Sequence, residues 1–282
     1  MTRRALHVER RGRGPALMLL HGFTGTGCSL AGLSAAFERE FDTLAPDLPG
    51  HGGSTGGARD GRYEFDDTLQ DLVATLDAAG HRRAHWLGYS LGARLALGCA
   101  VRYPDRVASL VLISGRAGIA DPAERAARRR ADEELAARIE AIGVEAFVDE
   151  WLAQPLFASQ QRLAPAVRAE QRRARLVHEA REMAASLRGL GPGAQPPLFA
   201  DLSRVEVPVL LVAGALDTRF VAAAHEMAGS LPRAEVCEIA AAGHAAHLEQ
   251  PAAVIAAVGD FLRRVTHPAS FPSLHSVQET AT

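Results

Sequence analysis

The chain of 282 residues is 48% hydrophobic and 23% charged, which is typical of a globular protein and too apolar for one that is disordered throughout. Its formal net charge of −2 creates no overall field that would attract nucleic acid or an anionic membrane, so neither is an expected partner. All 31 basic side chains are arginine, and the lack of lysine excludes a Schiff-base lysine, a pyridoxal enzyme and a P-loop nucleotidase.

The three cysteines, Cys28, Cys99 and Cys237, lie far apart and form no CxxC pair. This spacing argues against a disulfide framework or a zinc site and fits a reducing cytoplasm. Arg3 and Arg4 are not followed by the apolar run of a signal peptide, and no apolar run approaches the ~18 residues of a membrane span. We therefore expect a cytoplasmic protein without a metal or other cofactor, and the oligomeric state stays open.

Short apolar runs typical of buried strands alternate with helical patterns along most of the chain. The strands are expected at residues 16–20, 41–45, 84–88, 107–114, 207–213 and 234–240, and a helix is expected at 91–103. Strands that alternate with helices indicate βαβ units, so the sequence predicts an α/β fold with a mainly parallel sheet flanked by helices.

The strand signal vanishes between residues 115 and 193. Asp121 followed by Pro122 and Glu124 is the pattern of a helix N-terminus, and apolar residues then recur at helical spacing, at Leu135, Ile139 and Ile142. We expect residues 115–193 to form a helical lid inserted into a core made of 1–114 and 194–265. We also expect residues 189–197 to form a Gly/Pro-rich return linker and the polar residues 266–282 to form a mobile tail.

The strongest motif is Gly88-Tyr89-Ser90-Leu91-Gly92. A GxSxG pattern alone is weak, but here it lies between an expected strand and an expected helix, the context of a nucleophile elbow. The glycines allow a tight turn that exposes Ser90 at the helix N-terminus. We therefore predict that Ser90 is catalytic.

A catalytic serine needs a histidine as base and an acid that orients the histidine, in the chain order Ser, Asp or Glu, His. Asp217 follows the strand expected at 207–213, and His244 follows the strand expected at 234–240. Both lie at carboxyl ends of strands, where open α/β sheets carry their sites. His247 is the competing histidine, but it lies deeper in the following helical stretch and has the weaker claim.

Two backbone N–H groups are expected to form an oxyanion hole. One belongs to Leu91, the residue after the nucleophile, and the other to Phe23 in the loop after an early strand. The loop at 47–52 has a structural role in this interpretation.

These motifs resemble the α/β-hydrolase superfamily and, more narrowly, the family of 2-succinyl-6-hydroxy-2,4-cyclohexadiene-1-carboxylate synthases of menaquinone biosynthesis. The HGF and GxSxG motifs are shared across the superfamily, whereas the lid stretches and GAQPPL are specific to the synthases. The matching stretches are HGFTG (21–25), DLPGHGGS (47–54), GYSLGAR (88–94), AERAARRRADEELAARIE (123–140), QPLFAS (154–159), SLRGLGPGAQPPL (186–198) and GHAAH (243–247).

The resemblance implies a carbon–oxygen lyase that eliminates pyruvate from 2-succinyl-5-enolpyruvyl-6-hydroxy-3-cyclohexene-1-carboxylate. In such an enzyme the triad serine, made basic by its histidine, removes the proton next to the succinyl ketone. The oxyanion hole holds the resulting enolate, and no acyl-enzyme forms.

A small-molecule substrate with several carboxylates requires cations, and arginine forks suit carboxylates best. Arg94 lies one helical turn beyond Ser90, where it can face the same cleft. The resemblance further assigns substrate contacts to Arg128, Trp151 and Arg175. Tyr89, at the variable position of the elbow, and Arg219, a cation near the site, are two more candidates for substrate binding. For Arg128 a solvated helix face, for Trp151 the lid core and for Tyr89 simple packing stay open as alternatives.

Two departures from the synthase pattern concern the substrate contacts. His178 and Glu179 stand where the family usually has an Asn pair, which puts Arg175 in question and leaves Arg172 or Arg173 as substitutes. In the loop that carries Asp217, Ala215 replaces a glutamate, while Arg219 in place of lysine keeps a cation.

Two other functions compete with the synthase. A carboxylesterase or C–C bond hydrolase would use Ser90 as a nucleophile, and a non-catalytic receptor would only bind a ligand. Two or three arginines that converge on Ser90 would favour the synthase, whereas an apolar pocket would favour the esterase.

Overall fold

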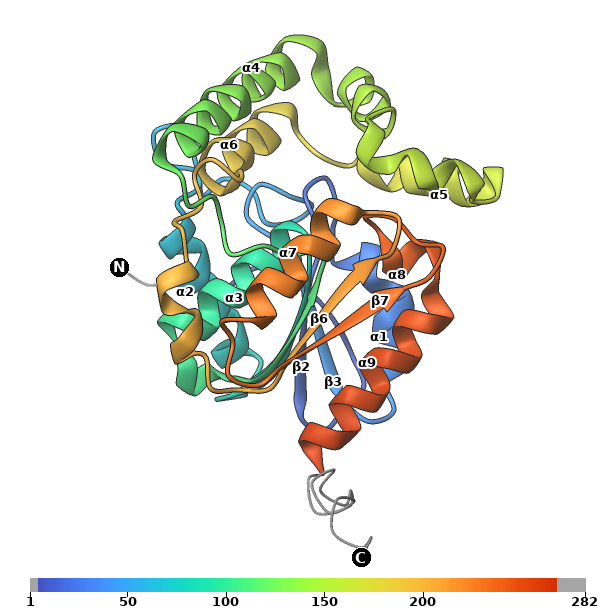
Figure 1. Cartoon of the computed structure of the whole chain (residues 1–282). Helices are drawn as coiled ribbons and strands as arrows, with labels where there is room; N and C mark the ends of the chain where they lie inside the picture. Colours follow the sequence, from blue (N-terminus) through green and yellow to red (C-terminus); the bar gives the residue numbers. More distant parts are fainter. Residues whose placement is uncertain (1–4, 268–282) are drawn as a thin grey trace, which may run out of the picture.

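The computed structural model describes residues 5–267, which form a seven-stranded sheet with helices on both faces and a helical insertion above one end (Figure 1). The strands are β1 Val8–Arg11, β2 Ala16–Leu20, β3 Asp42–Pro46, β4 Ala84–Tyr89, β5 Val107–Ile113, β6 Val209–Gly214 and β7 Ala234–Ile239. The α-helices are α1 Ala31–Phe37, α2 Phe65–Ala78, α3 Leu91–Arg102, α4 Pro122–Leu152, α5 Pro165–Arg175, α6 Ala180–Leu190, α7 Thr218–Ala228, α8 Ala246–Glu249 and α9 Pro251–Thr266. Four 3-10 segments, Gly27–Leu30, Pro104–Arg106, Pro155–Arg162 and Phe199–Arg204, complete the order.

The sheet order is β1-β3-β2-β4-β5-β6-β7, and every neighbouring pair is parallel except β1 with β3. This confirms the expected α/β fold with a mainly parallel sheet. The six strands predicted from the sequence are all present, with ends that differ by two residues at most. The antiparallel edge strand β1 was not predicted, because Glu9, Arg10 and Arg11 give it little apolar character.

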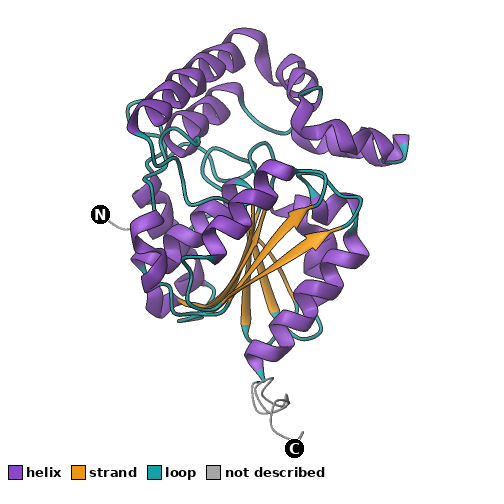
Figure 2. Cartoon of the chain, in the orientation of Figure 1, coloured by secondary structure: helices purple, strands orange, loops and turns teal. Residues whose placement is uncertain are grey.

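Helices cover both faces of the sheet (Figure 2). On one face, α2, α3 and α7 pack on apolar side chains that include Met18, Trp86 and Leu112. On the other face, α1 and α9 pack on a second set that includes Leu17, Val111 and Val212. Strand β2 is buried along its whole length. Its residues are therefore all apolar, without the alternation of a half-exposed strand, as expected for a central parallel strand.

The insertion between β5 and β6 contains α4, α5 and α6. Helix α4 begins as the sequence predicts, since the Asp121 carboxylate accepts the Glu124 N–H at 2.7 Å and Pro122 occupies the first turn. Its helical conformation is broken at Gly143, where φ is 77° and ψ is 170°. Helices α4 and α6 share an apolar cluster of their own, which includes Ile139, Phe147 and Met183.

The ends of the expected segments differ slightly from the structure. Helix α6 continues to Leu190, so the return linker begins two residues later than expected. Thr266 is the last residue of α9 rather than the first of the tail. The rest of that tail, except His267, lies outside the described residues.

Candidate active site

Ser90 lies in a strained turn between β4 and α3. Its backbone has φ 51° and ψ −104°, a conformation that non-glycine residues adopt only where the surroundings enforce it. A Cβ atom on Gly92 would lie 2.1 Å from the carbonyl oxygen of Leu20, so no larger residue fits there. The turn thus pushes the Ser90 side chain out of the sheet at the start of α3, as the sequence predicts.

His244 and Asp217 meet Ser90 from two other strand ends. His244 Nε2 lies 3.1 Å from Ser90 Oγ, and His244 Nδ1 lies 2.8 Å from Asp217 Oδ2. With Nδ1 donating its proton to the carboxylate, Nε2 is left to accept the serine hydroxyl. The structure therefore brings the three predicted triad residues into hydrogen-bonding contact.

The loop that carries His244 is fixed by polar contacts. Ser114 Oγ donates to the His244 carbonyl at 2.7 Å. The Glu249 carboxylate accepts the N–H groups of Gly243 at 2.8 Å and of Ala245 at 3.3 Å. The imidazole is thus held by its own backbone as well as by Asp217.

The competing His247 takes no part in this chain of hydrogen bonds. Its ring packs on Tyr89 with 4.4 Å between ring centroids, and its buried Nδ1 has no partner within residues 5–267. Burial, reinforced by His244 and Arg175, lowers the pKa of His247 to about 3. His247 is therefore a neutral packing residue behind the triad.

A cavity of about 430 Å³ lies between the elbow and the insertion, and Ser90 and His244 open into it. Among the predicted site residues, it is lined by Phe23, Tyr89, Leu91, Arg94, Arg128, Trp151 and Arg219. Leu91 is the first residue of α3, so its N–H has no acceptor within the helix. Aromatic rings form part of the wall, with Trp151 5.4 Å from Phe23 and 5.7 Å from Phe157 between centroids.

Arg94 is buried, with 7% of its surface exposed. It donates to the carbonyl of Leu190 at 2.8 Å and to the Gln195 side-chain oxygen at 3.2 Å. Within the described part of the chain no carboxylate lies within 4.0 Å of it. Burial lowers its pKa to about 10. Its hydrogen-bond partners are neutral, and the attraction of the more distant Asp132 only partly offsets the cost of burying its charge. The position of Arg94 therefore suits an anionic ligand in the cavity.

Three further arginines line the same cavity. Arg128 is already paired with Asp132 at 2.7 Å, whereas Arg116 and Arg219 have no carboxylate within 4.0 Å among residues 5–267. Burial and the neighbouring Arg219 lower the pKa of Arg116. Arg116 was missed in the sequence, although its position two residues after Ser114, at the end of β5, follows the strand-end rule that located Asp217.

Arg175 lies outside this cavity. It lines a separate space of about 20 Å³ beside Phe23, Tyr89 and His247, and its Nε donates to Thr24 Oγ1 at 3.2 Å. Arg172 and Arg173, the two alternatives to Arg175, do not line the Ser90 cavity either. Arg172 pairs with Asp149 and Glu145, and Arg173 pairs with Glu170, all on the surface.

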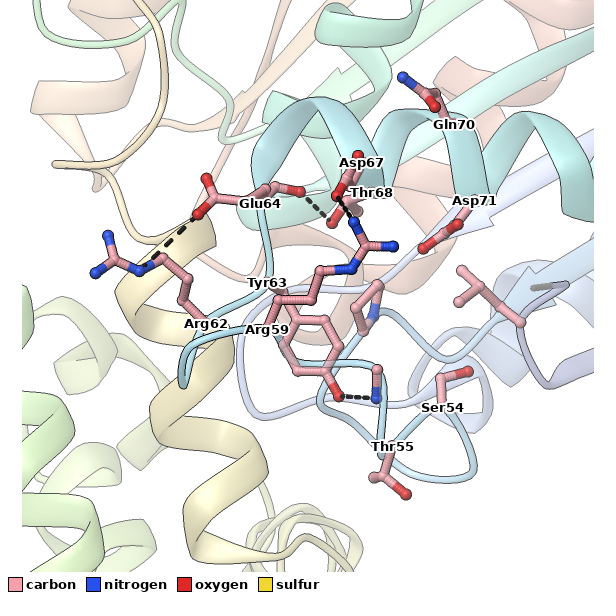
Figure 3. Close-up of a pocket in the computed structure, with 13 residues that line it drawn as sticks. Ser54, Thr55, Arg59, Arg62, Tyr63, Glu64, Asp67, Thr68, Gln70 and Asp71 are labelled. Atoms are coloured by element: carbon pink, nitrogen blue, oxygen red, sulfur yellow. Dashed lines mark hydrogen bonds and ion pairs between the residues drawn. The ribbon is translucent and has the colours of Figure 1, made fainter. Parts of the chain in front are cut away.

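A wider cavity of about 590 Å³ lies beside the start of α2 (Figure 3). Its charged side chains face one another, with Arg59 3.7 Å from Asp67 and Arg62 3.9 Å from Glu64. Its lining holds no hydroxyl–histidine pair. The cavity therefore lacks the chemistry found at Ser90.

Residues 5–267 contain neither a metal-binding cluster nor a helix suited to span a membrane. Across residues 5–267, no group of three or more His, Cys, Asp or Glu side chains is arranged to hold a metal ion. Over the same residues, none of the helices combines the length and the apolar character that a bilayer span requires.

Comparison with known proteins gives a consistent result. Residues 15–251 match the family model described as alpha/beta hydrolase fold. A Bacillus subtilis (strain 168) protein, provisionally named 2-succinyl-6-hydroxy-2,4-cyclohexadiene-1-carboxylate synthase, is 36% identical over 94% of this chain and 96% of its own. The synthase of that name from Escherichia coli O1:K1 / APEC is 35% identical over 88% of this chain and 94% of its own. The structure of MenH from S. aureus superposes with a TM-score of 0.88 and 30% identity, over 92% of this chain and 99% of that one.

Proposed function

The chain belongs to the α/β-hydrolase fold family and, within it, to the 2-succinyl-6-hydroxy-2,4-cyclohexadiene-1-carboxylate synthases of menaquinone biosynthesis, and from this premise we propose how its residues eliminate pyruvate. The substrate of this lyase reaction is 2-succinyl-5-enolpyruvyl-6-hydroxy-3-cyclohexene-1-carboxylate. The observation that carries the assignment of residues is Arg94, a buried cation without a carboxylate partner that lines the cavity at Ser90.

Ser90 acts as the base in this proposal. His244 Nε2 draws the hydroxyl proton, which its 3.1 Å contact with Ser90 Oγ supports. Ser90 Oγ then takes the proton from the ring carbon next to the succinyl ketone, and the pair of electrons from that C–H bond forms an enolate. Asp217 stabilises the imidazolium that develops.

The N–H groups of Phe23 and Leu91 receive the enolate oxygen. Donors fixed before the reaction stabilise developing charge without reorganising, and removal of one such donor typically costs roughly 10²–10³-fold in rate. When the electrons return through the ring double bond, the C–O bond to the enolpyruvyl group breaks and the enolate of pyruvate leaves. This enolate takes up one proton to become pyruvate, and the His244 imidazolium gives up one, so the proton taken from the ring carbon is balanced and the triad returns to its starting state.

Arg94, Arg116 and Arg219 hold the substrate carboxylates, with Arg128 as a fourth, partly neutralised cation. Arg94 is fixed by Leu190 and Gln195, so its remaining N–H groups are already oriented for a ligand. Tyr89 and Trp151 contact the ring of the substrate across the cavity. Arg175 is 3.2 Å from Thr24 and outside this cavity, so we give it no substrate contact.

The carboxylesterase or C–C bond hydrolase remains the competing function, because the same triad can attack an ester. Four arginines in the lining of the Ser90 cavity favour the polycarboxylate substrate over a neutral ester. We also propose that the protein acts in the cytoplasm, a location that its three free cysteines support.

Pyruvate release from the enzymatically generated precursor tests the proposal. We expect continuous turnover by the wild-type protein, several orders of magnitude less by Ser90→Ala, and poor turnover of a nitrophenyl ester without a burst. A nitrophenyl burst together with no pyruvate release would replace the synthase with the esterase.

A further inference from the structure

We infer that the insertion holds the oxyanion loop in its active conformation through Thr24, with His178 and Arg175 as positioning residues. This inference rests on the proposed function, since it takes the Phe23 N–H as an oxyanion donor. This N–H belongs to the peptide between Gly22 and Phe23, and the carbonyl of the same peptide accepts the Gly25 N–H at 3.0 Å across a turn that contains Thr24. The orientation of the peptide therefore depends on how Thr24 is held.

Thr24 has an unusual backbone conformation. Its φ is 69°, in the left-handed region that β-branched residues rarely adopt. Such a conformation persists where surrounding contacts determine it, and it is common at functional sites. Thr24 is fully buried, so these contacts come from protein groups.

Three side chains bind Thr24 at three different atoms. His51 Nε2 accepts its N–H at 3.3 Å, and His178 Nε2 donates to its carbonyl at 2.9 Å. Arg175 Nε donates to its hydroxyl oxygen at 3.2 Å. His51 belongs to the core, whereas His178 and Arg175 belong to the insertion, more than 150 positions along the chain.

His178 also binds a second core loop. Its Nδ1 accepts the N–H of Gly52 at 3.2 Å, while its ring packs edge-on against His51 with 5.2 Å between centroids. These two roles require a neutral imidazole, with Nε2 as donor and Nδ1 as acceptor. Burial lowers the pKa of both His51 and His178 and so keeps both rings neutral.

The consequence is that the oxyanion loop and the insertion form one unit. If the segment of His178 moves away from the core, Thr24 loses two of its three side-chain partners, and the neighbouring Phe23 N–H loses its fixed direction. The insertion therefore completes the oxyanion hole in addition to covering the cavity.

Three substitutions of His178 test this inference. His178→Phe keeps a ring but removes both hydrogen bonds. His178→Gln has a donor near the position of Nε2 and can still reach the Thr24 carbonyl. His178→Asn can accept the Gly52 N–H but is too short to reach Thr24.

We expect kcat for pyruvate release to fall roughly 10–100-fold in the Phe and Asn variants, because a displaced donor stabilises the transition state less well. KM should change by less than about twofold, since no ground-state contact with the substrate is lost. His178→Gln should retain most of the wild-type kcat. Arg172→Gln is the matched control in α5, because among residues 5–267 the carboxylates paired with Arg172 are those of Asp149 and Glu145, both inside the insertion. The kcat of this control should be unchanged.

Amide hydrogen exchange of the free protein gives a readout that does not depend on activity. Exchange at residues 22–25 should become faster in His178→Asn and stay slow in His178→Gln. Equal kcat values for the Gln and Asn variants, or a folded His178→Phe protein with wild-type kcat, would overturn the inference. If the wild-type protein releases no pyruvate, the proposed function fails instead, and the same order of variants is then measured on nitrophenyl acetate hydrolysis, which needs the same oxyanion donors.

Discussion

Replacement of Arg94 by methionine separates the binding role of this residue from its structural role. Burial lowers the pKa of Arg94 from 12.5 to about 10, which corresponds to a cost of about 3 kcal/mol for keeping the charge inside the folded protein. Against this, its two hydrogen bonds to Leu190 and Gln195 contribute roughly 1.5–3 kcal/mol each. The two effects nearly cancel, so Arg94→Met should lower the free energy of unfolding by only about 0–3 kcal/mol.

The loss of catalysis should be larger than this small loss of stability suggests. A charge-assisted bond to a substrate carboxylate contributes roughly 1.5–3 kcal/mol, so kcat/KM for pyruvate release should fall about 10–100-fold. Arg94→Lys keeps the charge without the planar fork and should lie between wild type and Arg94→Met.

The assay combines steady-state kinetics with a thermal melt of the same samples. Arg102→Met is the control, because Arg102 lies at the exposed end of the same helix, 3.7 Å from Asp66, and its kinetics should equal those of the wild type. The reasoning is refuted if Arg94→Met melts far below wild type while its folded fraction keeps the wild-type kcat/KM, since Arg94 would then be a purely structural residue.

Three further predictions concern the triad, the new arginine and acid stability. Ser90→Ala should abolish turnover almost completely with an unchanged melt, and Asp217→Asn should cost less, because it misorients the base without removing it; equal losses would contradict this order. Arg116→Gln should raise KM more than it lowers kcat, and an unchanged KM would exclude a carboxylate contact. Burial lowers the pKa of His21 from 6.5 to about 4, so its contribution to stability is complete above pH 6.5 and is lost as the pH falls towards 4. At pH 5 the loss is about 2 kcal/mol, and a melting temperature that stays constant from pH 7 to pH 5 would contradict it.

The sequence predicted most of the sheet and the positions of the triad for one physical reason. Central parallel strands are buried on both faces and are apolar throughout, so they are easy to locate, and their carboxyl ends meet at one edge. Ser90 and Asp217 each follow such a strand, whereas His244 follows the edge strand β7, which is only partly buried. The structure brings the three side chains together at 3.1 Å and 2.8 Å.

The remaining features depend on contacts that no local pattern records. Strand β1 lies at one edge of the sheet and pairs with β3 alone, so polar residues are tolerated at all of its positions except Val8. Gly143 interrupts α4 although the apolar spacing before it is regular, because one glycine inside a helical pattern does not by itself predict a break. His178 departs from the family pattern, yet its partners Thr24 and Gly52 lie more than 120 positions away in the sequence.

The acceptors of Arg94 have a consequence for recombination between members of this fold family. Leu190 and Gln195 lie at the end of α6 and in the return segment after it. The N–H of Leu198 donates at 2.8 Å to the carbonyl of Ala117, in the segment that leads into the insertion. The helical insertion looks like an exchangeable module. A chimera that replaces residues 190–195, however, satisfies the buried Arg94 guanidinium only if the new segment places a carbonyl at position 190 and an acceptor side chain at position 195 in the same way. A functional graft must therefore keep Arg94 and the acceptors at positions 190 and 195 together, and the same constraint limits how freely evolution can exchange insertions on this core.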